Sequence, residues 1–175
     1  MPIKTIFLDR DGVVNQEVNY LYKPEDFKFI NGIFDACLHF KSLGYEIIII
    51  TNQSGISRGY YNQNDYQKLT KWMLNQFNNN GISILDTYHC PHSPESSCNC
   101  RKPRPGMFLS ACEKHNIEMS QSWMIGDKET DIVGANNAGI TNTILVRSGH
   151  KINEKETNAK FVLESINSSK NIIKI

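Results

Sequence analysis

The sequence has no excess of charge of either sign and no long hydrophobic run. Its 19 lysine and arginine residues nearly balance 18 aspartate and glutamate residues, and the formal net charge is +1. Because there is no strong positive field, we expect neither a nucleic-acid nor a membrane partner. No apolar stretch approaches the ~20 residues that a membrane-spanning helix needs. The N-terminal residues run straight into an apolar segment without the pattern of a secretory leader, which predicts a cytoplasmic protein.

The cysteine count is odd, which does not suit a disulfide scaffold. Three of the five cysteines, Cys90, Cys98 and Cys100, lie within eleven residues together with His92. In a reducing compartment, clustered cysteines more often bind a metal than form bridges. Three thiolates and one imidazole complete a tetrahedral set for Zn²⁺ and leave no position for water, so the sequence predicts a structural zinc site. His89 is a less favoured ligand than a simple strand-end side chain.

Apolar runs typical of strands alternate with segments of helical periodicity. Strands are expected over residues 3–8, 45–50, 82–89, 122–125, 141–146 and 160–163, and helices over residues 32–44, from 62, from 105 and over 131–138. This alternation predicts an α/β fold with a doubly wound, mostly parallel sheet, helices on both faces and no large cap domain. The chain is long enough for one domain with a full core. We expect a single domain over residues 1–175, with residues 89–104 as a zinc loop. The residues after 147, which include a polar tail from 164, have no expected role beyond closing the sheet.

Residues 9–12 (Asp-Arg-Asp-Gly) follow directly on the first apolar run. In an open α/β sheet ligands bind outside the carboxyl ends of the strands, so Asp9 and Asp11 should both face a crevice. Two carboxylates this close repel each other unless a cation or a proton relieves them. A divalent metal provides that relief and leaves one carboxylate free to act as a nucleophile. Taken alone, the motif also suits an acidic turn after an edge strand.

Two further polar segments are candidates for binding an anion. Residues 51–55 (Thr-Asn-Gln-Ser-Gly) come after the isoleucine run and offer a hydroxyl, an amide and backbone N–H groups that can cradle phosphate oxygens. Such a stretch by itself is often an ordinary turn. Residues 101–106 combine basic side chains with prolines that start a helix, so the cationic heads gather near a helix N-terminus and favour an anion. A solvated basic loop is the alternative for this segment.

A fourth polar segment begins with Asp127, after the strand expected over residues 122–125. Mg²⁺ prefers oxygen ligands in octahedral geometry, and an acid at the end of a third strand would join Asp9 and Asp11 around one ion. Asp131 lies four residues later. It either joins this site or serves only the dipole at the start of the following helix.

Taken in order, these motifs resemble those of the haloacid dehalogenase (HAD) superfamily, and more narrowly its heptose-bisphosphate and histidinol-phosphate phosphatase branch. The resemblance rests on residues 9–12, 51–55, 90–92, 98–103 and 126–127. It implies a HAD-like Rossmannoid phosphomonoesterase that uses Mg²⁺ and removes the 7-phosphate of D-glycero-D-manno-heptose 1,7-bisphosphate, in the supply of activated heptose for surface polysaccharide. The alternatives are a histidinol-phosphate phosphatase, a DNA 3′-phosphatase-like domain and an inactive zinc-containing binding module. We expect a sugar bisphosphate as the partner and a monomeric enzyme.

The resemblance also implies roles for individual residues. Asp9 would attack phosphorus and become an aspartyl phosphate, and Asp11 would act as general acid and then as general base. Thr51 and Lys102 would hold the transferring phosphoryl group. Mg²⁺ would be held by the Asp9 side chain, the Asp11 main-chain carbonyl and Asp127. Substrate contacts are expected from Arg10, Glu17, Val18, Asn19, Tyr20, Asn52, Gln53, Ser54, Arg101 and Lys128.

The basic residues favour a substrate with two phosphates. Arg101, Lys128 and Arg58 are candidates to bind the second phosphate, whereas an imidazole and an amine would prefer acidic or aromatic partners. Only residues 93–97 separate the two pairs of zinc ligands, a shorter stretch than in many enzymes of this branch. Substrate contacts that those relatives make from this loop are therefore not carried over to this chain.

Overall fold

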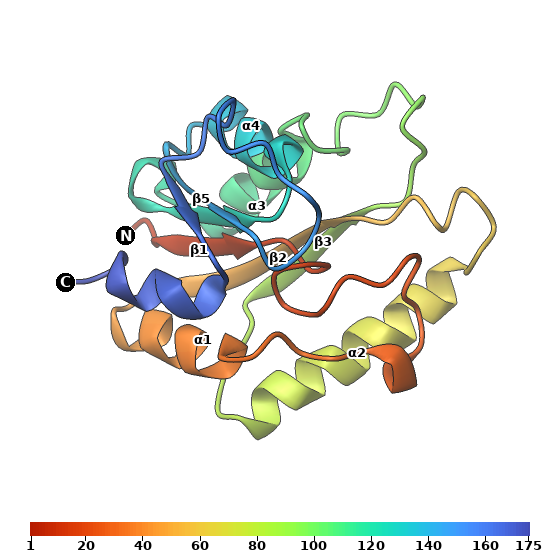
Figure 1. Cartoon of the computed structure of the whole chain (residues 1–175), viewed down its shortest axis with the longest axis horizontal. Helices are drawn as coiled ribbons and strands as arrows, with labels where there is room; N and C mark the ends of the chain where they lie inside the picture. The colour runs from red at the N-terminus through yellow and green to blue at the C-terminus, as the bar shows by residue number, and fades with distance from the viewer.

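The computed structural model describes residues 1–175 and contains one six-stranded sheet in which every neighbouring pair of strands is parallel (Figure 1). In spatial order the strands are β3 (Asp86–Cys90), β2 (Glu46–Asn52), β1 (Thr5–Leu8), β4 (Trp123–Gly126), β5 (Asn142–Val146) and β6 (Phe161–Leu163). Four helices link consecutive strands: α1 (Ile33–Ser42), α2 (Gln63–Asn79), α3 (Gly106–His115) and α4 (Glu129–Asn137). The predicted α/β fold is confirmed.

The helices lie on both faces of the sheet, with α1 and α2 below it and α3 and α4 above it in Figure 1. The isoleucine run of β2 shows why both faces need apolar side chains. Ile47 and Ile49 belong to the core under α1 and α2, whereas Ile48 and Ile50 belong to the core under α3. Successive side chains of a strand point to opposite faces, so a strand covered on both sides requires an uninterrupted apolar run.

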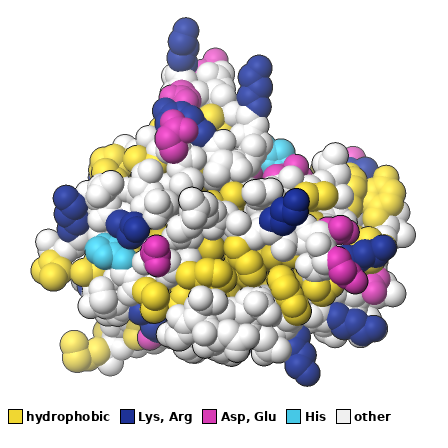
Figure 2. Space-filling view, turned by 60° about the horizontal axis from the view of Figure 1, so that its bottom comes forward, with side chains coloured by type: hydrophobic (Ala, Val, Ile, Leu, Met, Phe, Trp, Pro, Cys, Tyr) yellow, Lys and Arg dark blue, Asp and Glu magenta, His cyan; other side chains and the backbone are white.

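Aromatic side chains strengthen the face that carries α1 and α2. Phe29 packs at 4.8 Å from Phe34 and at 5.9 Å from Trp72, measured between ring centroids. These rings are only partly buried, and hydrophobic side chains form a band across the face that Figure 2 brings forward. No helix is long and apolar enough to cross a membrane.

The sheet reverses its strand order at β1, which places a crevice between the ends of β1 and β4. Leu8 pairs with Ile49 of β2 on one side and with Ile125 of β4 on the other. The segments that follow these three strands therefore leave the sheet at the same edge. Such a switch point is where ligands bind in open parallel sheets.

The C-terminal segment does more than the sequence predicted. It forms a 3₁₀ helix over Ile166–Asn171, and Ile166 and Ile173 belong to the same buried core as α1. The ring of His39 makes a hydrogen bond of 2.8 Å with the Ile173 carbonyl oxygen. The expectation of a tail that only closes the sheet was wrong, because its few apolar residues are spaced to cover α1.

The expected helix start at Asn62 is confirmed as a capping box. The Asn62 Oδ1 atom accepts a hydrogen bond of 2.9 Å from the Asp65 backbone N–H, and the Asp65 Oδ2 atom accepts one of 3.0 Å from the Asn62 N–H. Two donors that have no partner within the helix are satisfied in this way.

We predict that Asn62→Ala lowers the free energy of unfolding by about 1 kcal/mol, because it removes one half of this cap. Urea-induced unfolding, followed by circular dichroism, measures the change. Asn64→Ala is the matched control, since Asn64 is exposed in the same helical turn and makes no side-chain hydrogen bond. Equal stability of the two variants would contradict the assignment of the cap.

Candidate active site

A cavity of about 540 Å³ opens at the carboxyl edge of the sheet. Most of the residues predicted to form the site line it, although they come from five separate segments of the chain. These residues are Asp9, Asp11, Glu17, Val18, Asn19, Tyr20, Thr51, Asn52, Gln53, Ser54, Arg101, Lys102 and Lys128. Arg58 is exposed and is not among the residues that line the cavity.

Arg10 differs from its predicted role as a substrate contact. Its side chain is 1% exposed and does not line the cavity. Its Nη2 atom donates hydrogen bonds of 3.0 Å to the Asp11 carboxylate and 3.2 Å to the Leu21 carbonyl oxygen. The Arg10 guanidinium is therefore a buried counter-ion for Asp11. This ion pair offsets part of the repulsion between Asp9 and Asp11, which the sequence analysis expected a metal to offset.

Two side-chain amides also donate hydrogen bonds to the Asp11 carboxylate. The Asn15 Nδ2 atom donates to Asp11 Oδ1 at 3.0 Å, and the Gln53 Nε2 atom donates to Asp11 Oδ2 at 3.1 Å. Gln53 also donates to the Thr51 hydroxyl at 2.8 Å and accepts a hydrogen bond from Tyr61. These hydrogen bonds hold the Asp11 side chain in one orientation at the cavity wall. Thr51, which was expected to bind the phosphoryl group, and Gln53, which was expected to contact the substrate, lie next to it.

Lys102 is fully enclosed at the base of the cavity. Its Nζ atom donates to Asp9 Oδ1 at 3.0 Å and to the Ile50 carbonyl oxygen at 2.8 Å, and it lies 2.7 Å from Asp131 Oδ1. Burial alone would lower the pKa of Lys102, but the charges of Asp131 and Asp9 raise it above the ordinary value. The side chain therefore remains a cation, with all three of its donors engaged.

Asp131 performs both of the roles that the sequence left open. Its Oδ2 atom accepts hydrogen bonds of 3.1 Å from the backbone N–H groups of Asp127 and Lys128, at the start of α4. Its Oδ1 atom pairs with Lys102. Gly126 makes this approach possible, because a Cβ atom there would lie 2.3 Å from the Asp131 Cβ atom.

Three buried carboxylates gather beside this single ammonium group. Asp9, Asp127 and Asp131 each place an oxygen within 4.8 Å of the others. Burial and the charge of Asp131 raise the pKa of Asp9 well above its ordinary value and raise the pKa of Asp127 to about 6. One of the Asp127 oxygens, Oδ1, is buried without a hydrogen-bond partner.

These observations fit a divalent cation. Three negative charges against one positive charge leave two to be neutralised, and an unpaired buried carboxylate oxygen is costly without a partner. Mg²⁺ takes oxygen ligands and carries the matching charge. Asp9 and Asp127 have the positions that the sequence analysis expected, whereas the Asp11 carboxylate faces Arg10 and leaves only its main-chain carbonyl for the ion.

Residues 148–150 (Ser-Gly-His) also form part of the site, and the sequence analysis missed them. The Ser148 hydroxyl donates to the Gly12 carbonyl oxygen at 2.7 Å. A Cβ atom on Gly149 would lie 2.1 Å from Asp127 Oδ2. His150 donates to that same oxygen from its backbone N–H at 2.9 Å and contacts it through Nδ1 at 2.6 Å. Their place in the sequence could have identified these residues, since this small polar segment follows β5, the strand next to β4.

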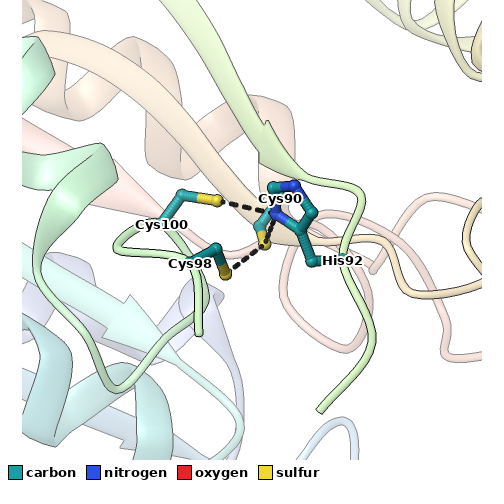
Figure 3. A group of neighbouring side chains, drawn as sticks. All are labelled: Cys90, His92, Cys98 and Cys100. Atoms are coloured by element: carbon teal, nitrogen blue, oxygen red, sulfur yellow. Dashed lines mark hydrogen bonds between the residues drawn. The ribbon is translucent and has the colours of Figure 1, made fainter. Parts of the chain in front are cut away.

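The predicted zinc ligands converge on one point (Figure 3). Cys90 Sγ lies 3.3 Å from His92 Nδ1 and 3.7 Å from Cys98 Sγ, and His92 Nδ1 lies 3.2 Å from Cys100 Sγ. Burial opposes ionisation of Cys98, but hydrogen bonds from the Arg101 backbone and from Ser96 lower its pKa to about 6. Burial raises the pKa of Cys90 to about 12 and also raises the pKa of Cys100. The fit to Zn²⁺ therefore rests on the donor types and on their convergence at one point.

His89 is not part of this cluster. Its ring stacks on Tyr66 with centroids 4.0 Å apart, and its Nε2 atom lies 3.0 Å from Gln63 Oε1. The interpretation of His89 as an ordinary strand-end side chain agrees with this placement.

The zinc loop delivers Lys102 to the cavity. Cys100, the last zinc ligand, is two residues before Lys102. Asn52 holds the backbone of Lys102 on both sides, accepting from its N–H at 3.1 Å and donating to its carbonyl oxygen at 3.2 Å. Arg104 clamps the other limb of the loop by donating to the Ser96 carbonyl oxygen at 2.8 Å. Asn52 thus acts on Lys102 rather than directly on Asp9.

Comparisons with known proteins agree with this geometry. The HAD-hydrolase-like family model matches residues 99–169. The chain is 48% identical to a D-glycero-alpha-D-manno-heptose-1,7-bisphosphate 7-phosphatase of Photorhabdus laumondii, over 90% of each chain. It is 44% identical to a D-glycero-beta-D-manno-heptose-1,7-bisphosphate 7-phosphatase of Vibrio cholerae, over 92% of this chain and 91% of that one. A solved D,D-heptose 1,7-bisphosphate phosphatase of B. bronchiseptica, complexed with magnesium and phosphate, is 27% identical, covers 97% of both chains and has a TM-score of 0.85.

We expect the purified protein to contain about one zinc ion per chain, from the ligand count. Cys98→Ser should lose the metal and most of the activity, because the loop that carries Lys102 is then no longer fixed. Elemental analysis of the protein and a phosphatase assay measure the two effects. Cys112→Ser is the matched control, since Cys112 lies outside the cluster and bonds to the Ile117 carbonyl oxygen. Zinc-free wild-type protein with full activity would refute a structural metal.

Proposed function

The chain belongs to the family of HAD-like D-glycero-D-manno-heptose-1,7-bisphosphate 7-phosphatases, and we propose that it hydrolyses the 7-phosphate of such a sugar bisphosphate with the help of Mg²⁺. The relatives described above support this substrate by name. The observation that carries the chemistry is the meeting of Asp9, Asp11 and Lys102 in one cavity, beside the unpaired oxygen of Asp127.

The first half of the proposed reaction uses Asp9 as the nucleophile. A carboxylate oxygen of Asp9 attacks phosphorus, the bond from phosphorus to the sugar oxygen breaks, and an aspartyl phosphate forms. Asp11 enters this step protonated and gives its proton to the departing sugar oxygen, after which it is a carboxylate paired with Arg10. Lys102, at 3.0 Å from Asp9, favours the charged form of the nucleophile and balances negative charge on the transferring group.

The second half returns the enzyme to its starting state. Asp11, now a carboxylate, takes a proton from a water molecule that attacks the phosphorus of the aspartyl phosphate. The bond between phosphorus and the Asp9 oxygen breaks, and inorganic phosphate leaves. The hydrogen bonds from Asn15 and Gln53 keep Asp11 in place for both proton transfers.

The acids at the base of the cavity are placed to hold the metal. Asp9, Asp127 and the Asp11 main-chain carbonyl would hold Mg²⁺, which supplies positive charge to the phosphoryl oxygens when bound. The Thr51 hydroxyl faces the same part of the cavity and offers a further donor to those oxygens.

The basic side chains of the cavity support a substrate with a second phosphate. Arg101 and Lys128 both line the cavity, and the Lys128 side chain is exposed to it without an acidic partner. The loop that follows β1 also lines the cavity and is placed to contact the sugar, through Glu17, Val18, Asn19 and Tyr20.

We further propose that the enzyme acts in the cytoplasm as a single catalytic domain and a monomer. The single continuous sheet, at whose carboxyl edge the segments of the site meet, supports a single catalytic domain. The reaction would supply a heptose 1-phosphate for the nucleotide-activated sugar of surface polysaccharide.

We predict that Asp9→Asn lowers turnover of a simple phosphate ester by more than about 1,000-fold, because an amide cannot replace the nucleophilic carboxylate. Steady-state assay measures the loss, and circular dichroism with zinc content shows that the fold persists. Asp35→Asn is the control, because it makes the same aspartate-to-asparagine change at an exposed position in α1. If Asp9→Asn kept its turnover, the proposed enzyme mechanism would be wrong.

We also predict that kcat/KM for heptose 1,7-bisphosphate exceeds that for histidinol phosphate by at least about tenfold. Lys128→Met should narrow this ratio, since it removes a charge that only the second phosphate uses, while the apolar part of the side chain remains. Parallel kinetics on the two substrates measures both quantities. A preference for histidinol phosphate would assign the enzyme to the other substrate of its branch and would leave the hydrolytic mechanism unchanged.

A further inference from the structure

The two carboxylate oxygens of Asp127 have unequal surroundings. Oδ2 is held by the His150 backbone N–H at 2.9 Å and by the His150 ring at 2.6 Å. Oδ1 is buried and has no hydrogen-bond partner. Asp127 is 0% exposed, so water does not compensate either oxygen. The side chain is therefore fixed through one oxygen in an orientation that leaves the other free.

The Nδ1 atom of His150 must carry a hydrogen in this arrangement, because a carboxylate oxygen only accepts. The opposite ring atom, Nε2, lies 3.7 Å from Glu17 Oε1, on the loop that lines the far wall of the cavity. The ring thus lies between an acid at the base of the site and an acid of the substrate loop.

The backbone around His150 is itself held tightly. Ser148 is bonded to the Gly12 carbonyl oxygen, and the Cα atoms of the two glycines are so close that a Cβ atom on Gly149 would lie 2.7 Å from the Gly12 Cα atom. The turn that follows the nucleophile and the segment that carries His150 are therefore packed against each other, with Asp127 close to both.

We propose that His150 is a positioning residue for the magnesium site, which holds Asp127 Oδ2 so that Oδ1 is presented to the ion. The inference rests on the proposed function, because it takes Mg²⁺ as the ion that Asp9 and Asp127 help to bind. A hydrogen bond to the outer oxygen of a ligating carboxylate fixes its rotamer before the metal arrives and lowers the cost of ordering it. His150 does not touch the reacting atoms, and its contribution is to metal affinity.

The test measures Mg²⁺ binding to the substrate-free protein by isothermal titration calorimetry. His150→Ala should weaken the affinity for Mg²⁺ by about tenfold, in the range observed when the outer partner of a metal ligand is removed. The effect is limited because the backbone N–H of residue 150 still reaches Asp127. At saturating Mg²⁺, kcat should stay within about threefold of the wild-type value, since the ring takes no part in the chemical steps.

His150→Asn is the rescue variant, because the amide N–H₂ group of Asn occupies nearly the place of the Nδ1–H group and can donate to Asp127. Its Mg²⁺ affinity should return to within about threefold of the wild type. Lys151→Ala is the control in the same segment, since Lys151 is exposed and makes no side-chain hydrogen bond or ion pair. Thermal unfolding of each variant without Mg²⁺ verifies that the fold is retained.

Three outcomes would overturn the inference. Wild-type affinity in His150→Ala would show that the ring does not position the ligand. A folded His150→Asn variant as weak as His150→Ala would show that the hydrogen bond to Asp127 is not the cause. Wild-type protein that binds no Mg²⁺ would refute the proposed function itself, and the inference with it, so the two failures are distinguishable.

Discussion

The site depends on one buried ammonium group. Lys102 brings the only positive charge among Asp9, Asp127 and Asp131, and its three donors are divided among two of these acids and the carbonyl oxygen of Ile50 at the end of β2. Removing such a cation would leave several buried charges without compensation, which is among the most costly changes a fold can suffer. Two further restraints hold Lys102 in place, namely Asn52 at the end of β2, which bonds to its backbone, and the cysteine cluster just before it in the sequence.

The parallel sheet explains how residues so far apart in sequence come together. Strands that run in one direction end at one edge, and the reversal of strand order between β1 and β4 opens a space there. Each strand then contributes what its first following residue carries, as Asp9 does after β1 and Asp127 after β4. The helices hold the strands by covering both faces, and they leave this edge free for ligands.

How much could be predicted from the sequence follows from the same geometry. Asp9, Thr51 and Asp127 directly follow apolar runs, so local pattern was enough to place them at one edge. The cysteine spacing was likewise a local signal. Arg10 was expected to contact the substrate because of the family resemblance, whereas the fold buries it against Asp11. His150 was missed although its segment follows an apolar run, because its contact with Asp127 joins residues far apart in the sequence. The expectation of a single domain stays a prediction.

The central place of β1 has a consequence for synthesis on the ribosome. This strand is synthesised before the others, but its partner β4 begins more than a hundred residues later. The backbone N–H of Thr5 can donate its hydrogen bond to the Ser122 hydroxyl only after that segment has been made. A growing polypeptide therefore holds Asp9 early but gains Asp127 and Asp131 only after more than a hundred further residues have been added. The acids of the site consequently cannot meet before the segment that carries β4 has been synthesised.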